Sequence, residues 1–391
     1  MSEQDVKRMT HVGSKRQSFI KDWGLRIIVR GKYILPSLQM AAISPWIAAA
    51  ILLAAPSLVC AGFESDFIPF PEVTVHYNDR DVPNLTQSGS DPLVDFFYTA
   101  KYNDWRLLSE VIISGDERDL ERFIIGRVNT DGDQVWIGRN NTDLDQWNRL
   151  FHRETYLQTT IHRPGIDEFE DDGGVLPAHI TGISLIDNDE MGGHTLNYGM
   201  TIGLGPALMD QHLNPYDLLK INRGSHDLAA TGHVSYQAEG DSFNDSGLFA
   251  GYAIIPSEDI NIREVKQTVV GAYTNYFTSL NLVWRASVFY IANNLDLNGG
   301  ATKKESFGYV YLQPEYNLNQ TLTLYGRLEA SSGAKNDLYV QAIPSFVTKR
   351  SLVGARYQLQ NSQVIKVEIA ELEQYSQRFV AAEIQWSAAI P

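Results

Sequence analysis

The feature that most constrains this chain is an alternation of apolar and polar residues that persists from about residue 93 to the end. Residues 194–204 show it clearly, since Leu196, Tyr198 and Met200 alternate with Asn197 and Gly199. Successive side chains of a strand point to opposite faces, so such a segment has one face suited to lipid and one suited to water. Segments of about ten residues with this pattern are typical of transmembrane barrel strands.

The alternation predicts fifteen strands. They lie at 93–102, 105–113, 119–128, 134–139, 180–186, 194–204, 228–238, 247–255, 265–276, 280–292, 306–316, 321–330, 346–358, 362–372 and 378–388. Bacterial single-chain barrels have an even number of strands. The first tight turn, at Asn103-Asp104, requires a strand before it, and Val73 to Tyr77 fits that place. The predicted fold is therefore all-β, a transmembrane antiparallel up-and-down barrel of about sixteen strands, with fourteen as the fallback.

A soluble β-sandwich also alternates, and the polar face and the strand ends favour the membrane barrel over it. Charged residues such as Arg285 and Glu368 lie mid-strand on the polar face. Aromatic residues gather at the predicted strand ends, as an interfacial girdle requires. They are Tyr98, Tyr102, Trp105, Tyr273, Tyr290, Tyr309, Tyr311, Tyr357 and Trp386.

The connections between the predicted strands alternate in length, as expected for short periplasmic turns and long external loops. The tight ones are 103–104, 277–279, 317–320 and 360–362. The long ones are 140–179, 205–227, 294–305 and 331–345.

The N-terminal segment has the order of a secretory signal: basic, then apolar, then small. Residues 33–63 contain no charged residue, and Val59-Cys60-Ala61 predicts cleavage after Ala61. We expect 1–61 to be a cleaved leader and 62–391 to be the barrel domain. An uncleaved anchor is the alternative, because the uncharged stretch exceeds eighteen residues; a lipoprotein at Cys60 fits less well, and translation could instead start at Met40.

Composition excludes several classes of function for the mature chain. Removing the leader leaves 24 basic and 44 acidic residues, a net charge near −20. Such a chain is a poor nucleic-acid binder. The single cysteine, Cys60, lies in the leader, so disulfides, thiolate catalysis and cysteine metal ligation are not expected.

The connection 140–179 is the most unusual segment, because it carries too many apolar and aromatic residues for a loop surrounded by water. We predict that it folds into the barrel lumen. Its acids would then face wall arginines, and the resulting transverse field would select ions by charge. The predicted constriction residues are Asp167, Glu168, Glu170, Asp171 and Asp172 on the loop, with Arg139, Arg285, Arg327 and Arg356 on the wall. Alternatively, the arginines pair with neighbouring wall acids such as Glu110 and Glu329.

Other chemistry finds less support. The acids at 167–172 offer oxygen ligands for calcium, yet their spacing matches no EF-hand loop, and the histidines His152, His162, His179 and His194 have no spacing that demands a metal. Ser225-His226-Asp227 cannot form a triad among themselves, since adjacent strand residues face opposite ways. We predict no enzymatic activity and no cofactor.

The chain resembles porin-type outer-membrane proteins of proteobacteria. The run from Asp167 to Gly174 resembles the Glu-Phe-Gly-Gly stretch of their constriction loop, with extra acids before the glycines. Trp147-Asn148, Arg163-Pro164 and Gln385-Trp386-Ser387 resemble a group within them that has no assigned activity. The resemblance implies an outer-membrane location. Trp386 is followed by five further residues, whereas such barrels usually end on an aromatic residue.

These observations predict a passive, porin-like channel for small hydrophilic solutes or ions, surrounded by outer-membrane lipid. The resemblance adds a homotrimer as the expected assembly, since porins of this size are often trimers. A closed or plugged barrel that acts as a receptor, an adhesin or a structural envelope protein is the alternative. An anchored periplasmic β protein is a third alternative if the leader is retained.

Overall fold

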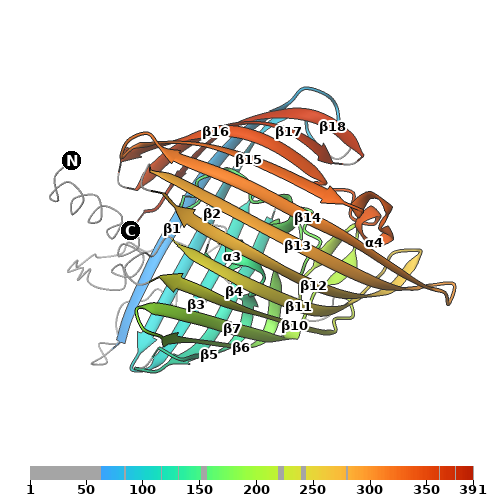
Figure 1. Ribbon diagram of the computed structural model, residues 1–391, viewed down its shortest axis with the longest axis horizontal. Helices are drawn as coiled ribbons and strands as arrows, with labels where there is room; N and C mark the ends of the chain where they lie inside the picture. The colour runs from blue at the N-terminus through green and yellow to red at the C-terminus, as the bar shows by residue number, and fades with distance from the viewer. Residues whose placement is uncertain are drawn as a thin grey trace, which may run out of the picture. The chain divides into compact units, whose positions relative to one another are not determined.

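The alternating segments form one closed antiparallel barrel of sixteen strands (Figure 1). This computed structural model describes residues 63–390, apart from 83–84, 116, 131, 151–155, 219–223, 239–243, 279–280, 361 and 375. The described residues belong to a single compact unit. The predicted leader, 1–61, lies outside the described residues, so its cleavage stays a prediction.

The barrel strands follow one another in chain order, and β1 pairs with β18 to close the ring. They are β1 (Phe63–Asn78), β2 (Ser88–Tyr102), β3 (Trp105–Ser114), β4 (Glu117–Val128), β5 (Gln134–Asn141), β6 (His179–Glu190), β7 (His194–Leu204), β10 (Leu228–Ala238), β11 (Asp245–Pro256), β12 (Ile262–Phe277), β13 (Leu282–Leu297), β14 (Thr302–Asn317), β15 (Leu322–Ser332), β16 (Lys349–Gln360), β17 (Gln363–Gln374) and β18 (Gln377–Ala388).

The short elements lie in the connections. They are α3 (Asp145–Leu150) and the 3₁₀ turn η1 (Gly165–Asp167), then the hairpin β8 (Ala207–Met209) and β9 (His212–Asn214), and finally η2 (Ala334–Asn336) and α4 (Leu338–Gln341). Among the residues that the structure describes, no helix is both long and apolar enough to cross a membrane.

All sixteen predicted strands are confirmed, including the one inferred from the parity of the turns. The fourteen-strand fallback is therefore not needed. One predicted connection is wrong: most of 294–305 belongs to β13 and β14, which leaves only 298–301 between them. Its charged and amide residues indicated a loop, but backbone pairing continues through them, since Asn294 is paired with Lys304.

The connections divide between the two ends of the barrel. The end at which β1 begins and β18 finishes carries the turns 103–104, 129–133, 191–193, 239–244, 278–281, 318–321 and 361–362. We call it the short-turn end. The opposite, long-loop end carries 79–87, 115–116, 142–178, 205–227, 257–261, 298–301, 333–348 and 375–376.

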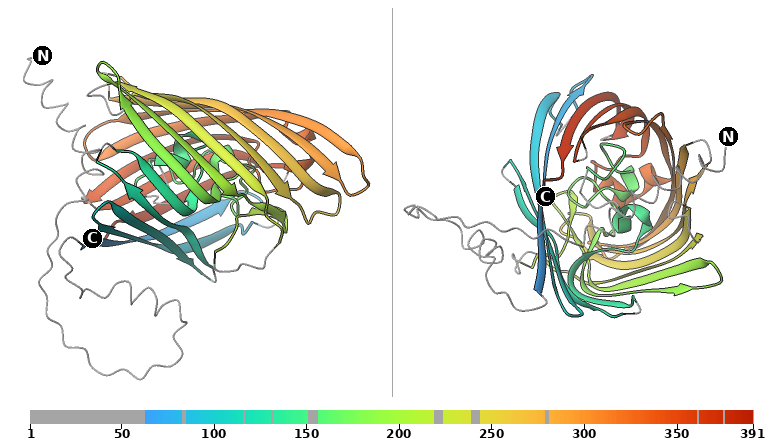
Figure 2. Two further views of the ribbon diagram at one scale, coloured as in Figure 1. Left: turned by 90° about the horizontal axis from the view of Figure 1, so that it is seen from below. Right: turned by 90° about the vertical axis from the view of Figure 1, so that its left-hand side faces the viewer.

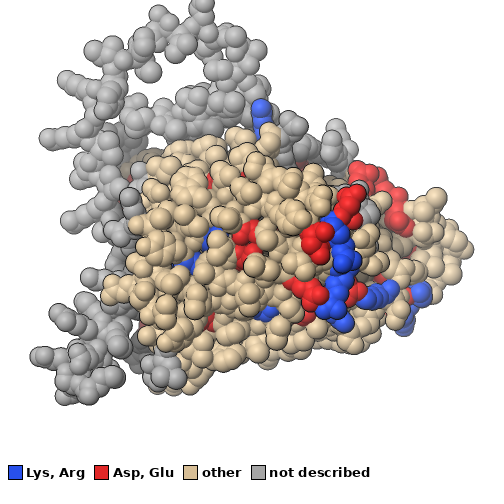
Figure 3. Space-filling model, turned by 90° about the horizontal axis from the view of Figure 1, so that it is seen from above, with Lys and Arg blue, Asp and Glu red and all other residues tan. Residues whose placement is uncertain are grey.

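The outward face of the barrel is apolar, as contact with lipid requires. Exposed aliphatic side chains such as Leu248, Leu328 and Val353 are more than 60% accessible. Figure 3 shows one such face, which is mostly uncharged, with charged side chains gathered toward one end. Exposed aromatic residues form a partial girdle near the short-turn end, and they are Tyr102, Trp105, Tyr236, Tyr276, Tyr316 and Tyr357.

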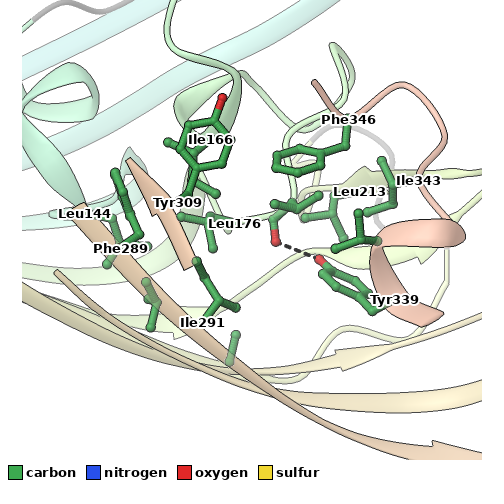
Figure 4. Packing of buried hydrophobic residues seen from close by; sticks show 14 of the residues in the cluster. Leu144, Ile166, Leu176, Leu213, Phe289, Ile291, Tyr309, Tyr339, Ile343 and Phe346 are labelled. Atoms are coloured by element: carbon green, nitrogen blue, oxygen red, sulfur yellow. Dashed lines mark hydrogen bonds between the residues drawn. The ribbon is translucent and has the colours of Figure 1, made fainter. Parts of the chain in front are cut away.

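The lumen holds an apolar core along the wall from β10 to β14. Three predicted girdle residues belong to it, because Tyr273, Tyr309 and Tyr311 are each at most 4% exposed. Their placement in the girdle was wrong, since alternate positions of a strand face the lumen and the loops packed there bury large rings. The connections 142–178, 205–227 and 333–348 contribute Leu176, Leu213 and Ile343 to the same core (Figure 4).

Candidate functional site

The connection 142–178 crosses the lumen, so the prediction of an inward loop agrees with the structure. Viewed along the barrel in Figure 2, α3 lies inside the ring of strands. Trp147 anchors this helix: its side chain is 1% exposed, and its indole nitrogen donates to the Tyr311 hydroxyl of β14 over 3.0 Å. Gln146 donates to the same hydroxyl over 2.9 Å.

Past α3, the loop segment 156–165 runs along the lumenal face of β14 to β17. Four basic side chains of that wall donate to its backbone carbonyl groups. The bonds are Arg327 to His162 (2.9 Å) and Arg163 (2.8 Å), Arg350 to Arg163 (2.6 Å), Arg356 to Tyr156 (3.2 Å) and Lys366 to Thr160 (3.0 Å). We call these four residues the basic ladder.

Three glutamates between the basic side chains accept hydrogen bonds from the same loop segment. Glu315 accepts from the Thr159 hydroxyl (2.9 Å), Glu368 from the Ile161 backbone (2.5 Å) and Glu329 from the Gly165 backbone (2.7 Å). The wall therefore supplies hydrogen-bond partners for both the N–H and the C=O groups of this irregular loop backbone. Such partners are needed because the segment is buried away from water.

The contact between loop and wall is close at Gly165. A Cβ atom at this position would lie 2.8 Å from the Val347 side chain and 2.9 Å from the Tyr309 hydroxyl. Only a residue without a side chain brings the backbone so near, which explains the glycine after Pro164.

The returning arm of the loop carries the predicted constriction acids. Glu168 lies 3.4 Å from Arg350, so the structure does pair a loop acid with a wall arginine, although with one absent from the predicted set. Glu170 holds His179 at 2.8 Å, and Glu121 approaches the other ring nitrogen at 3.2 Å. Asp171 and Asp172 are exposed.

Asp167 is buried beside Asp145, the first residue of α3. Asp145 accepts hydrogen bonds from the Ser287 and Tyr311 hydroxyls. Burial raises the pKa of both carboxyls, and the negative charge of Asp145 raises the pKa of Asp167 further. This pair therefore holds a proton more tightly than an ordinary aspartate.

The predicted wall arginines are placed differently from one another. Arg327 and Arg356 belong to the basic ladder. Arg285 pairs with Glu315 at 2.7 Å, and the buried Arg139 approaches Asp119 at 3.4 Å. Arg327 also contacts Glu329 at 2.6 Å, which is the alternative pairing with a wall acid.

Sequence reasoning missed Arg350, Lys366 and Asp145. Strand parity would have found the first two: Arg350 shares a face with Arg356, and Lys366 shares one with Glu368. No comparable signal marked Asp145, since its role depends on how the loop folds.

The other residues considered from the sequence do not converge on one site. His152 lies outside the described residues. His162 contacts Glu383 at 2.7 Å, whereas the ring of His194 lies tilted against that of Tyr236. The described residues contain no group of three or more His, Cys, Asp or Glu suited to hold a metal ion. Asp227 caps the Leu228 backbone, and His226 contacts the Gly205 carbonyl.

Comparison with known proteins identifies the fold. No family model and no curated sequence matches the chain. Among solved structures, it resembles an anion-selective porin from Comamonas acidovorans (10% identity, 84% of this chain and 100% of that chain, TM-score 0.57). It also resembles Salmonella typhi OmpF (11%, 84% and 98%, 0.55) and the outer-membrane channel DcaP of Acinetobacter baumannii (12%, 85% and 98%, 0.52). The predicted resemblance and fold class are confirmed: this chain has the sixteen-stranded barrel fold of the outer-membrane porins.

Proposed function

We propose that this chain is a passive channel for small hydrophilic solutes across the outer membrane, narrowed by the loop 142–178. The observation that carries the proposal is the attachment of this loop to the lumenal face of the barrel, from β10 to β18. The basic ladder binds the loop to β15–β17, and polar side chains on other strands stay accessible, such as Asp91 at 69%. A loop fixed in this way narrows a barrel without any covalent chemistry.

The predicted constriction acids then divide by burial. Asp171 and Asp172, which are exposed, would face the solute path. Asp167, Glu168 and Glu170, which are buried, would hold the loop in place. Of the predicted arginines, Arg327 and Arg356 share this holding role. Arg285 and Arg139 instead pair with the wall acids Glu315 and Asp119.

Planar-bilayer recording of the purified, heat-modifiable protein tests the channel. Discrete conductance steps are expected. Protein that shifts on heating in gels yet yields no steps would contradict the channel while leaving the barrel intact. N-terminal sequencing of the same sample tests cleavage after Ala61, and gel migration in mild detergent tests the homotrimer that the resemblance to porins implies.

The apolar core inside the lumen favours a second candidate. Three loops and the wall β10–β14 bury a continuous cluster there, so part of the lumen is filled like a protein interior. A fully plugged barrel would serve as a receptor, an adhesin or a structural envelope protein. It predicts heat-modifiable migration without conductance.

A further inference from the structure

Charge is distributed unevenly between the two sides of the lumen. The lumenal positions of β15–β17 carry the four basic side chains of the ladder and two glutamates, Glu329 and Glu368. The lumenal positions of the adjacent strands β18, β1 and β2 carry six acids and one lysine. The acids are Glu64, Asp66, Glu72, Asp91, Asp95 and Glu383, and the lysine is Lys101. We call β18, β1 and β2 the acidic wall.

The positive charges of the basic ladder are engaged by the loop. Arg327 and Lys366 are at most 1% exposed and Arg350 is 5% exposed, and all three donate to loop carbonyl groups. Arg327 and Arg350 also contact Glu329. Buried and compensated charges contribute little field to water elsewhere in the lumen.

Water reaches the acidic wall at several heights. The side chains of Glu64, near the short-turn end, and Asp91, near the long-loop end, are 60% and 69% exposed. Glu383, opposite His76 on β1, is 14% exposed. Glu72 accepts from Gln385 over 3.0 Å, so its carboxylate is fixed on the lumenal face.

The loop borders this wall at an ion pair and at an apolar cluster, in which Tyr156 and Leu157 of the loop pack together with Ile68 and Phe70 of β1. His162, whose side chain is 45% exposed, contacts Glu383 at 2.7 Å. Register places His76 opposite Glu383, and His76 contacts Asp91 at 2.8 Å. Outside these contacts, the lumenal face of this wall carries more carboxylates than lysine and arginine side chains.

We propose that solutes pass beside the loop 142–178, along the part of the acidic wall that the loop does not contact, and that this path selects small cations, with Glu72 and Asp91 as determinants of the selectivity. The inference rests on the proposed channel function. Fixed carboxylates beside a narrow aqueous path raise the local concentration of cations and exclude anions.

Reversal potentials of the full mature protein in planar bilayers, under a KCl gradient, test the path. The dilute compartment should become positive, because potassium crosses faster than chloride. The variant Glu72→Gln/Asp91→Asn should lower the ratio of potassium to chloride permeability at least about twofold. Glu383 is left unchanged in this design because it holds His162.

The matched control is Glu371→Gln/Asp189→Asn, which removes two acids from the outward face of β17 and β6 and should leave the ratio unchanged. Heat-modifiable migration establishes that each variant is folded. Anion selectivity of the wild type, or an equal ratio in the folded test variant, would overturn the inference and leave the channel standing. Absence of any conductance would overturn the channel, and the inference with it.

Discussion

At the scale of single residues, the loop is held by side chains that are buried together with their partners. Arg350 is an example: it bonds the Arg163 carbonyl and lies within 3.5 Å of Glu168 and Glu329. Removing one partner of such a group leaves the other charges without compensation, which costs more than the group contributes when it is intact.

We expect Arg350→Met to destabilise the barrel by about 3 kcal/mol, because Glu329 and Glu168 would remain buried without this cation. The measurement is the urea midpoint of the heat-modifiable gel shift. Arg378→Met is the control, since Arg378 pairs with Glu371 on the outward face and is 70% exposed; its urea midpoint should stay close to that of the wild type, because exposed ion pairs contribute little to stability. Equal midpoints for the two variants would argue against the ladder.

The pair Asp145–Asp167 gives a dependence of stability on pH. Because burial raises the pKa of Asp167 in the folded state, the folded protein keeps a proton that the unfolded chain releases. Stability from this pair is therefore present below the ordinary carboxyl pKa and is lost as the pH rises toward the folded value. Because asparagine does not titrate, Asp167→Asn should remove the loss of stability that the wild type shows as the pH rises.

Urea unfolding at acid pH and at pH above neutrality measures this effect. We expect Asp167→Asn to resemble the wild type in acid and to become relatively more stable as the pH rises. Asp171→Asn, at the exposed neighbour, is the control and should show no such trend. A variant destabilised equally at every pH would instead indicate a role in packing alone.

At the scale of elements, α3 is too short to be stable by itself, and its place is set by packing across the lumen. Trp147 is the largest side chain of α3 in that contact. It is buried against a core that includes Phe289 and Ile166. The helix therefore forms because the barrel wall offers it a surface.

We expect Trp147→Ala to cost about 3–5 kcal/mol through the cavity it creates, and to increase single-channel conductance because the loop loses its anchor. The urea midpoint of the heat-modifiable gel shift measures the loss of stability. Planar-bilayer recordings measure the single-channel conductance. Trp105→Ala, at a girdle tryptophan that is 53% exposed, should change conductance little. If folded Trp147→Ala keeps the wild-type conductance, the loop does not narrow the solute path.

At the scale of the whole molecule, closure depends on the pairing of β1 with β18. Val75 lies opposite Ile384, and both side chains are more than half exposed on the outward face. The chain does not end on an aromatic residue, yet the last strand has a partner on either side, β17 and β1.

A cysteine pair tests this closure. In a Cys60→Ser background, Val75→Cys with Ile384→Cys should form a disulfide, since directly opposed strand residues lie within reach of one. The oxidised, boiled product should migrate faster than the reduced one, because most of the chain would be looped. Val75→Cys with Val353→Cys, on the more distant β16, should show no such difference.

The barrel could be predicted from the amino-acid sequence without any structure. Alternation at positions such as Leu196, Tyr198 and Met200 specifies which face meets lipid, and a register shift by one residue would invert it. The parity of the turns then gave the number of strands, including β1. Both signals are local, so neighbouring residues suffice to find them.

The contacts of the loop became visible only in three dimensions. The sequence predicted that 140–179 turns inward and that its acids face wall arginines. It could not show that Arg327 and Lys366 would bind loop carbonyl groups, nor that Asp145 would meet Asp167. Those contacts join residues far apart in the chain, and the irregular backbone of the loop, which has no period, sets their geometry.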